Sequence, residues 1–183
     1  MRKLRKYLLL AFAAPMFGFA QDKDEKLIDW SPSRPLTWAD YEGRPNPNSD
    51  AAASTTTYLG LEYNVRNGGI RYTIQCRFSK TRSWGVAKTD YILKHEQGHF
   101  DIAEIFARML HKELSAYKFN RETFRDDLGA IYQRVSKAKE DFQNLYDRET
   151  DHSRLKVKQE EWYSRIRKML TELEDYSNYQ LAN

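Results

Sequence analysis

The sequence predicts an α+β protein in which a small antiparallel β-sheet is followed by a helical bundle. Between residues 55 and 79, apolar and polar residues alternate with the period of two that is typical of half-buried strands. The sequence Asn67-Gly68-Gly69 interrupts this alternation and is typical of a tight hairpin turn. From residue 89 onwards apolar residues recur with a helical period, and no proline occurs.

The segment before the hairpin, residues 21–54, is expected to be an extended arm. It holds four of the five prolines, together with Trp30 and Trp38, which we expect to fix the arm to the rest of the protein. The hairpin itself is expected over about residues 55–79, within a β region that reaches residue 85. Cys76 has the strand period of its apolar neighbours and is expected to be buried; as the only cysteine, it cannot form an intramolecular disulfide.

Three helices are expected within residues 89–183. The first runs from about residue 89, where Thr89 or Asp90 can cap it, to about residue 117. The second runs from about residue 121 into the 140s, and the third from about residue 153 to 176. The second helix carries a continuous apolar seam, formed by Phe124, Leu128, Ile131, Val135, Ala138, Phe142 and Leu145.

Residues 1–20 have the composition of a signal peptide. Four basic residues within the first six precede an apolar run from residue 7 to 19, and the small residues Gly18 and Ala20 stand at the −3 and −1 positions of a cleavage site. The run is too short for an ordinary membrane-spanning helix, although an uncleaved N-terminal anchor is the alternative. We therefore expect a mature domain of residues 21–183, exported to the periplasm or the outside, without stable membrane insertion.

The charge of the mature chain excludes one class of partner. The full sequence has 30 Lys and Arg against 26 Asp and Glu, and residues 1–20 hold four of the basic residues and no acidic residue. Removal of this segment leaves equal numbers of both signs. Nucleic-acid binding requires a basic surplus on the folded domain, so no nucleic-acid partner is expected.

The sequence YILKHEQGHFDIAEIF, residues 91–106, contains the candidate site. His95 and His99 are four residues apart, so on a helix both imidazoles can bind one zinc ion, and Glu96 between them can act as general base. Apolar residues surround the histidines, and Gly98 would allow another segment to approach closely. The alternative is a pair of core histidines bonded to backbone groups, since this pattern arises by chance in about one in a hundred such chains.

A catalytic zinc ion needs a third protein ligand and one open position. Extension of the apolar seam of the second helix places Glu149 and His152 on its core-facing side, whereas Glu122 and Asp126 face away from it. His152 is therefore preferred as the third metal ligand over Glu122 or Glu149. His111 is too far along the first helix to join the site and is expected at the surface.

Other residues near His152 have weaker support. Tyr146 is a candidate catalytic residue, because its hydroxyl could donate to an oxyanion, although a core tyrosine is the simpler interpretation. Asp147 or Asp151 could orient a ligand imidazole, but helix capping would explain either residue.

Three segments, LTWADYEGRP (36–45), HEQGHFDIAE (95–104) and YDRETDHS (146–153), resemble the bacterial family known as domain of unknown function 922 (DUF922). This family is described as predicted secreted zinc-dependent proteases. The resemblance implies a zincin-like fold, His95, His99 and His152 as zinc ligands and Glu96 as the catalyst. Ser153 departs from the glycine expected in the family, which puts little in doubt.

Two function classes follow from these residues. The first is a secreted or periplasmic zinc metallopeptidase, a hydrolase that acts on peptides or proteins with Glu96 as general base. The alternative is a non-catalytic envelope module that zinc stabilises and that binds a partner through its helices. A free carboxylate beside the metal has no use in a structural site, so Glu96 favours the enzyme. The sequence gives neither the substrate nor the oligomeric state.

Overall fold

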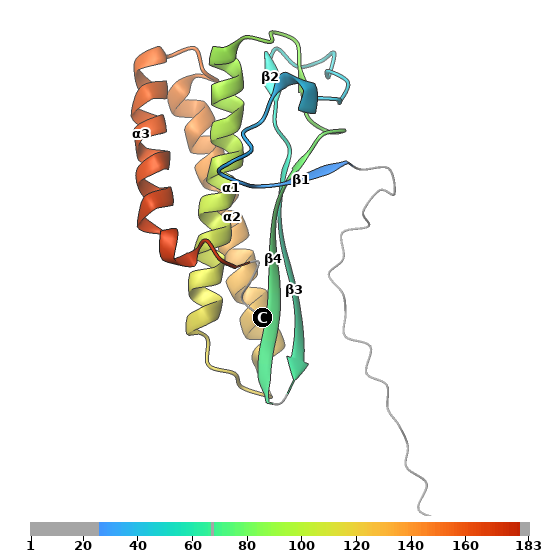
Figure 1. The fold of residues 1–183 in the computed structure, drawn as a ribbon, viewed down its shortest axis with the longest axis vertical. Coiled ribbons are helices and arrows are strands. Elements are labelled where there is room, and N and C mark those ends of the chain that lie inside the picture. The colour runs from blue at the N-terminus through green and yellow to red at the C-terminus, as the bar shows by residue number, and fades with distance from the viewer. Residues whose placement is uncertain (1–25, 67, 180–183) are drawn as a thin grey trace, which may run out of the picture.

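The computed structural model describes residues 26–66 and 68–179, so the expected signal peptide and the turn residue Asn67 lie outside the described residues. The α+β class is confirmed: short antiparallel sheets precede three long helices (Figure 1). None of the helices in the described part of the chain combines the length and the apolar character that a membrane span requires.

Two antiparallel sheets form the β region. The larger has the strand order β1-β4-β3, with β1 (Leu27–Asp29), β3 (Thr57–Arg66) and β4 (Gly69–Ser79). The expected hairpin is β3 and β4, which pair from Thr57 with Phe78 to Arg66 with Gly69. Gly68 has a φ of 75°, the left-handed conformation that a two-residue hairpin turn requires. The second sheet pairs β2 (Ala53–Ser54) with β5 (Trp84–Gly85).

The arm before the hairpin is fixed to the helices by its tryptophans, as expected. The indole of Trp30 donates to Asp101, and that of Trp38 donates to the carbonyl of Thr89. Residues 27–29 of the arm are not part of a loop, however. They form β1, which pairs with β4 and adds a third strand to the hairpin.

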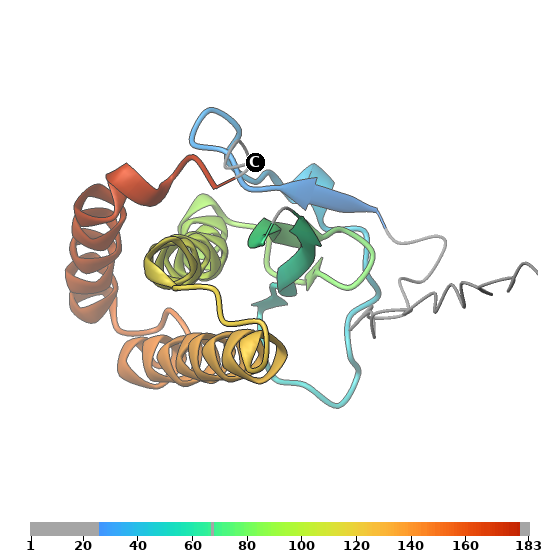
Figure 2. The ribbon, with the colours of Figure 1, turned by 90° about the horizontal axis from the view of Figure 1, so that it is seen from below.

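The three helices are α1 (Asp90–Ala116), α2 (Phe124–Thr150) and α3 (Lys156–Glu172). Seen along the bundle, α1 lies between the sheet on one side and α2 and α3 on the other (Figure 2). Because α1 is covered on several sides, most of residues 100–111 are buried, including Phe100, Ile102, Ile105 and Leu110. Thr89 caps α1, accepting a hydrogen bond from the amide of Ile92, as the sequence predicts.

Two expectations about the helices are wrong. The third helix begins at Lys156 rather than near residue 153, because Asp151, His152 and Ser153 all have positive φ angles of 47°, 50° and 72°. This left-handed turn ends α2 at Thr150, so the apolar seam does not extend to His152. His111 is also not a surface residue: it is 6% exposed, and its Nδ1 lies 3.0 Å from the hydroxyl of Tyr72.

Candidate metal centre

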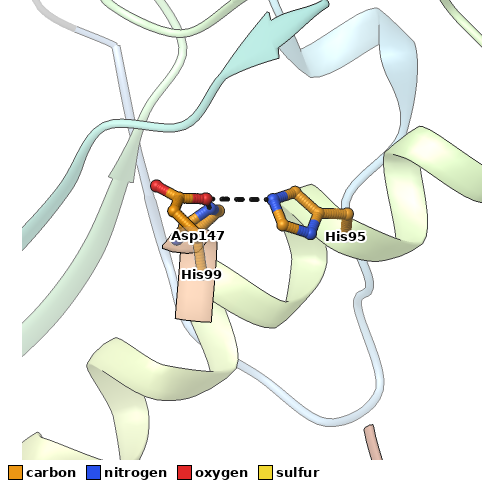
Figure 3. A group of neighbouring side chains, drawn as sticks. All are labelled: His95, His99 and Asp147. Atoms are coloured by element: carbon orange, nitrogen blue, oxygen red, sulfur yellow. Dashed lines mark hydrogen bonds and ion pairs between the residues drawn. The ribbon is translucent and has the colours of Figure 1, made fainter. Parts of the chain in front are cut away.

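The two histidines of the motif face the last turn of α2. The Nε2 atoms of His95 and His99 lie 3.2 and 3.0 Å from the same carboxylate oxygen, Oδ1 of Asp147 (Figure 3). His95 is 3% exposed, while the side chains of His99 and Asp147 are partly exposed. Helix α1 brings the two histidines together by their spacing, and the packing of α2 against α1 adds Asp147 as a third candidate ligand.

The opposite edge of each imidazole is held by a glutamine side chain. Nδ1 of His95 lies 2.6 Å from Oε1 of Gln159 on α3, and Nδ1 of His99 is hydrogen-bonded to Oε1 of Gln143 on α2. The orientation of both amides is fixed, because Nε2 of Gln143 donates to the carbonyl of His99 and Nε2 of Gln159 donates to the hydroxyl of Tyr146. Both Nδ1 atoms must therefore carry the proton that is donated to a glutamine oxygen.

This assignment leaves an electrostatic problem at the centre of the cluster. With Nδ1 protonated, the neutral imidazoles of His95 and His99 direct their Nε2 lone pairs at the Asp147 carboxylate, which is also only an acceptor. A proton or a cation must lie between them for the arrangement to be favourable. Burial opposes a charge on His99, but the hydrogen bond and charge of Asp147 prevail and raise the pKa of His99 to about 9.

The same charges act on Asp147. Partial burial alone would raise the pKa of its carboxyl, but the hydrogen bonds from His95 and His99 hold this pKa well below its usual value. Asp147 is therefore an anion that favours a proton on Nε2 of His99. A metal ion can replace that proton, and metal binding would release it.

The geometry of the three atoms fits a metal ion. The ligand atoms of His95, His99 and Asp147 all lie within 4.8 Å of one another. Tetrahedral zinc with ligands at about 2.0–2.2 Å holds them roughly 3.3 Å apart, close to the 3.0 and 3.2 Å between Asp147 and the histidines. Within residues 26–66 and 68–179, the group of His95, His99 and Asp147 could hold a metal ion, and two imidazoles with one carboxylate are a ligand set suited to zinc.

Glu96 lies beside the candidate ligands. It lines a cleft together with them, although it is only 4% exposed. Its Oε2 accepts a hydrogen bond of 2.6 Å from the hydroxyl of Thr55. Since the Thr55 proton is used, the 2.9 Å contact between Thr55 and Tyr41 has the Tyr41 hydroxyl as donor. Burial, together with the charge of Glu96, raises the pKa of Tyr41, so this hydroxyl stays protonated. No pattern in the sequence indicates that Thr55 and Tyr41 lie beside Glu96.

The structure places the other expected site residues differently. The side chain of His152 is 59% exposed, and its Nδ1 lies 3.6 Å from Oδ1 of Asp147, so it stands at the rim of the cluster. Glu149 accepts a hydrogen bond from the indole of Trp162, and Glu122 is exposed in the turn before α2. As a metal ligand, His152 would have to turn towards the histidines from its present position.

Tyr146 is fully buried behind the histidines. Its ring stacks on that of His95, and its hydroxyl donates to the carbonyl of His95 while accepting from Gln159. Gly98 makes this close approach possible, since a Cβ atom there would lie 2.5 Å from the Tyr146 hydroxyl. The expected oxyanion role would require this hydroxyl to leave both partners, whereas its present contacts orient His95.

A cleft of about 740 Å³ opens onto the cluster. One wall is the chain from residue 51 to 59, including β2 and the start of β3; the other is α2. His95, Glu96, His99, Asp147 and His152 all line the cleft, so the candidate metal position is accessible to a ligand from solvent.

The fold and the site define an α+β protein whose His-Glu-x-x-His helix supplies two ligands of a candidate metal centre. The chain belongs to the bacterial protein family of unknown function DUF922, whose sequence profile matches residues 39–153. That range contains His95, Glu96, His99, Asp147 and His152. Neither the curated proteins nor the solved structures contain a match to this chain.

Proposed function

We propose that this protein is an exported zinc-dependent metallopeptidase that hydrolyses peptide bonds in the cleft between α2 and residues 51–59. The observation that supports the proposal most strongly is the pair of imidazoles anchored at Nδ1, whose Nε2 lone pairs converge on Asp147. Export is supported by the signal-like composition of residues 1–20.

The zinc ion would be held by His95, His99 and Asp147, with His152 close enough to join or replace Asp147 after a change in the turn at residues 151–153. A bound zinc ion would lower the pKa of a coordinated water and polarise the carbonyl of the substrate. Gln143 and Gln159 keep the two imidazoles in the tautomer and orientation that ligation needs.

Glu96 would take the proton from the attacking water and then deliver it to the leaving amine. The hydroxyl of Thr55 donates to one carboxylate oxygen, Oε2, and is itself held by the hydroxyl of Tyr41. Among the described residues, none donates a hydrogen bond to the other oxygen, Oε1, which leaves that oxygen able to accept a proton. This division of the carboxylate between an anchored and an open oxygen favours a catalytic role over the alternative of a structural zinc site.

The test uses the mature protein, residues 21–183, and a mixture of unstructured peptides whose cleavage is followed by mass spectrometry. Zinc-loaded protein should cleave peptide bonds, a chelator should stop the cleavage, and added zinc should restore it. Cleavage that continues after the metal has been removed, or zinc-loaded protein without any cleavage, would contradict the proposal. The second result would favour the non-catalytic envelope module.

A further inference from the structure

Lys139 on α2 differs from the other charged residues near the cleft. It is the only lysine or arginine among the described residues that line the cleft, and it is partly buried. Within residues 26–66 and 68–179, no carboxylate lies within 4 Å of its ammonium group, whereas Lys137, two residues earlier, pairs with Asp141. Since burial of an unpaired charge is unfavourable, a partly buried lysine without a carboxylate partner indicates a role other than stabilising the fold.

A second unpaired group lies one helical turn away. The hydroxyl oxygen of Ser136 is buried and has no hydrogen-bond partner among the described residues, and Ser136 lines the same cleft. Residues three apart on a helix are neighbours on one face, so Ser136 and Lys139 offer a hydroxyl and an ammonium group to the same region. Burial lowers the pKa of Lys139, and a bound anion would reverse this effect.

The position of this pair relative to the candidate metal centre follows from the helix. Ser136, Lys139, Gln143 and Asp147 are spaced by three or four residues and form one stripe on α2 that faces the cleft. Eight residues separate Lys139 from Asp147, about 12 Å along the helix axis at 1.5 Å per residue. An extended peptide advances about 3.3 Å per residue, so this distance corresponds to three or four residues of a bound chain.

We propose that Lys139 and Ser136 form a subsite for a carboxylate of the peptide substrate, three or four residues from the bond that is cleaved. The inference rests on the proposed peptidase function and names the substrate class as acidic peptides. A single ammonium group and one hydroxyl suit the singly charged carboxylate, and the acidic side chain of the adjacent Glu140, which also lines the cleft, disfavours a more highly charged anion. The carboxylate can belong to an Asp or Glu side chain or to the C-terminus of the peptide.

The experiment compares matched fluorogenic peptides in three series. In the first two, Glu is compared with Gln at a position three or four residues before or after the cleaved bond. In the third, the peptide ends at that position in either a free carboxylate or an amide. The ratio of kcat/KM for the acidic and neutral peptides is measured for the parent, Lys139→Met, Lys139→Arg and Ser136→Ala. Lys137→Met is the matched control, because it removes a paired, exposed charge on the same helix.

The parent should prefer one acidic series by about 10- to 100-fold, the range expected for a hydrogen bond to a charged group. Lys139→Met should reduce this ratio to near one, Lys139→Arg should keep most of it, and Lys137→Met should not change it. The series that shows the preference identifies the source of the carboxylate. An equal ratio in the parent and Lys139→Met would overturn the subsite.

A binding measurement separates this inference from the proposed function. Fluorescein-labelled versions of the same peptides are titrated with the Glu96→Gln protein and followed by fluorescence anisotropy, which requires no hydrolysis. Tighter binding of the acidic peptide that is lost in Glu96→Gln/Lys139→Met would support the subsite even if the parent hydrolyses nothing. Equal binding of acidic and neutral peptides would overturn it. Lys139→Met should also raise the melting temperature, whereas a structural role for the ammonium group predicts a fall.

Discussion

Two clusters of polar side chains include residues of helix α1, and they differ in how their hydrogen bonds are satisfied. The metal cluster, His95, His99 and Asp147, brings acceptor atoms together and needs a cation between them. The distal cluster, Glu104, Arg108 and Tyr179, is complete by itself: Glu104 accepts hydrogen bonds from both partners. The comparison shows that burial alone does not indicate a binding site, whereas a convergence of acceptor atoms indicates a position for a cation.

The two clusters also differ in access. Glu104 and Arg108 are 1% and 3% exposed, and Arg108 additionally donates to the carbonyl of Leu170 and to Glu174. The metal cluster lines the large cleft instead. We therefore expect changes in the metal cluster to affect metal binding and hydrolysis, and changes in the distal cluster to affect stability.

The largest expected effect is on hydrolysis, from Glu96→Gln. The amide has nearly the same size but cannot take a proton from water, so hydrolysis should fall by about 10²- to 10⁴-fold. Zinc affinity and melting temperature should stay close to those of the parent, because Glu96 is not a ligand in this account. Hydrolysis by Glu96→Gln at the parental rate would remove the general-base role.

In the distal cluster, Arg108→Met should lower the free energy of unfolding by about 3–5 kcal/mol, because it leaves the Glu104 carboxylate buried without its ion-pair partner. Urea unfolding of the metal-free protein measures this change. Arg134→Met is the matched control, since it breaks an exposed ion pair with Glu113 and should change the free energy by less than about 1 kcal/mol. Equal effects of the two variants would mean that the distal cluster does not stabilise the fold as described.

Asp147→Ala and His152→Ala test which side chain completes the metal cluster. The observed contacts predict that Asp147→Ala lowers zinc affinity more, because only Asp147 lies within ligand distance of both histidines. Competition with a zinc indicator would give both affinities. If His152→Ala abolishes zinc binding while Asp147→Ala retains it, the left-handed turn at residues 151–153 must rearrange and His152 is the third ligand.

A smaller effect is expected from Gln143→Leu, which keeps the approximate size but removes the acceptor for Nδ1 of His99. Loss of such a partner of a ligand typically weakens metal binding by 10- to 100-fold. Gln133, also on α2 but exposed, gives the matched control Gln133→Leu. Identical zinc affinities of the two variants would show that the glutamine does not orient His99.

The sequence predicts those parts of the fold and of the candidate site that depend on neighbouring residues in the chain. The hairpin follows from alternation around a glycine turn, and His95, Glu96 and His99 share one helical turn, so their spacing alone predicts a common site. The third group could not be predicted in this way. The choice of His152 assumed that the helical seam continued, but α2 ends at Thr150 in a turn with three left-handed residues that are not glycine.

The hydrogen-bond partners of the two histidines could not be predicted from the sequence either. Gln143 and Gln159 are 44 and 64 residues away from the imidazoles that they contact, and glutamine on a helix is ordinarily a surface residue. The wrong expectation for His111 has a similar cause. His111 is buried because it contacts Tyr72 of β4 and Tyr179 near the end of the described chain. No local sequence pattern indicates either contact.

The central claim, that His95, His99 and Asp147 form a metal centre, is tested most directly by calorimetric titration of metal-free residues 21–183 with zinc. The account predicts one zinc ion per chain, and a melting temperature that rises with zinc, since a ligand at 100 times its Kd stabilises the native state by about 2.7 kcal/mol. His95→Ala/His99→Ala should remove both effects. The absence of zinc binding by the parent, or equal binding by the double variant, would contradict the claim.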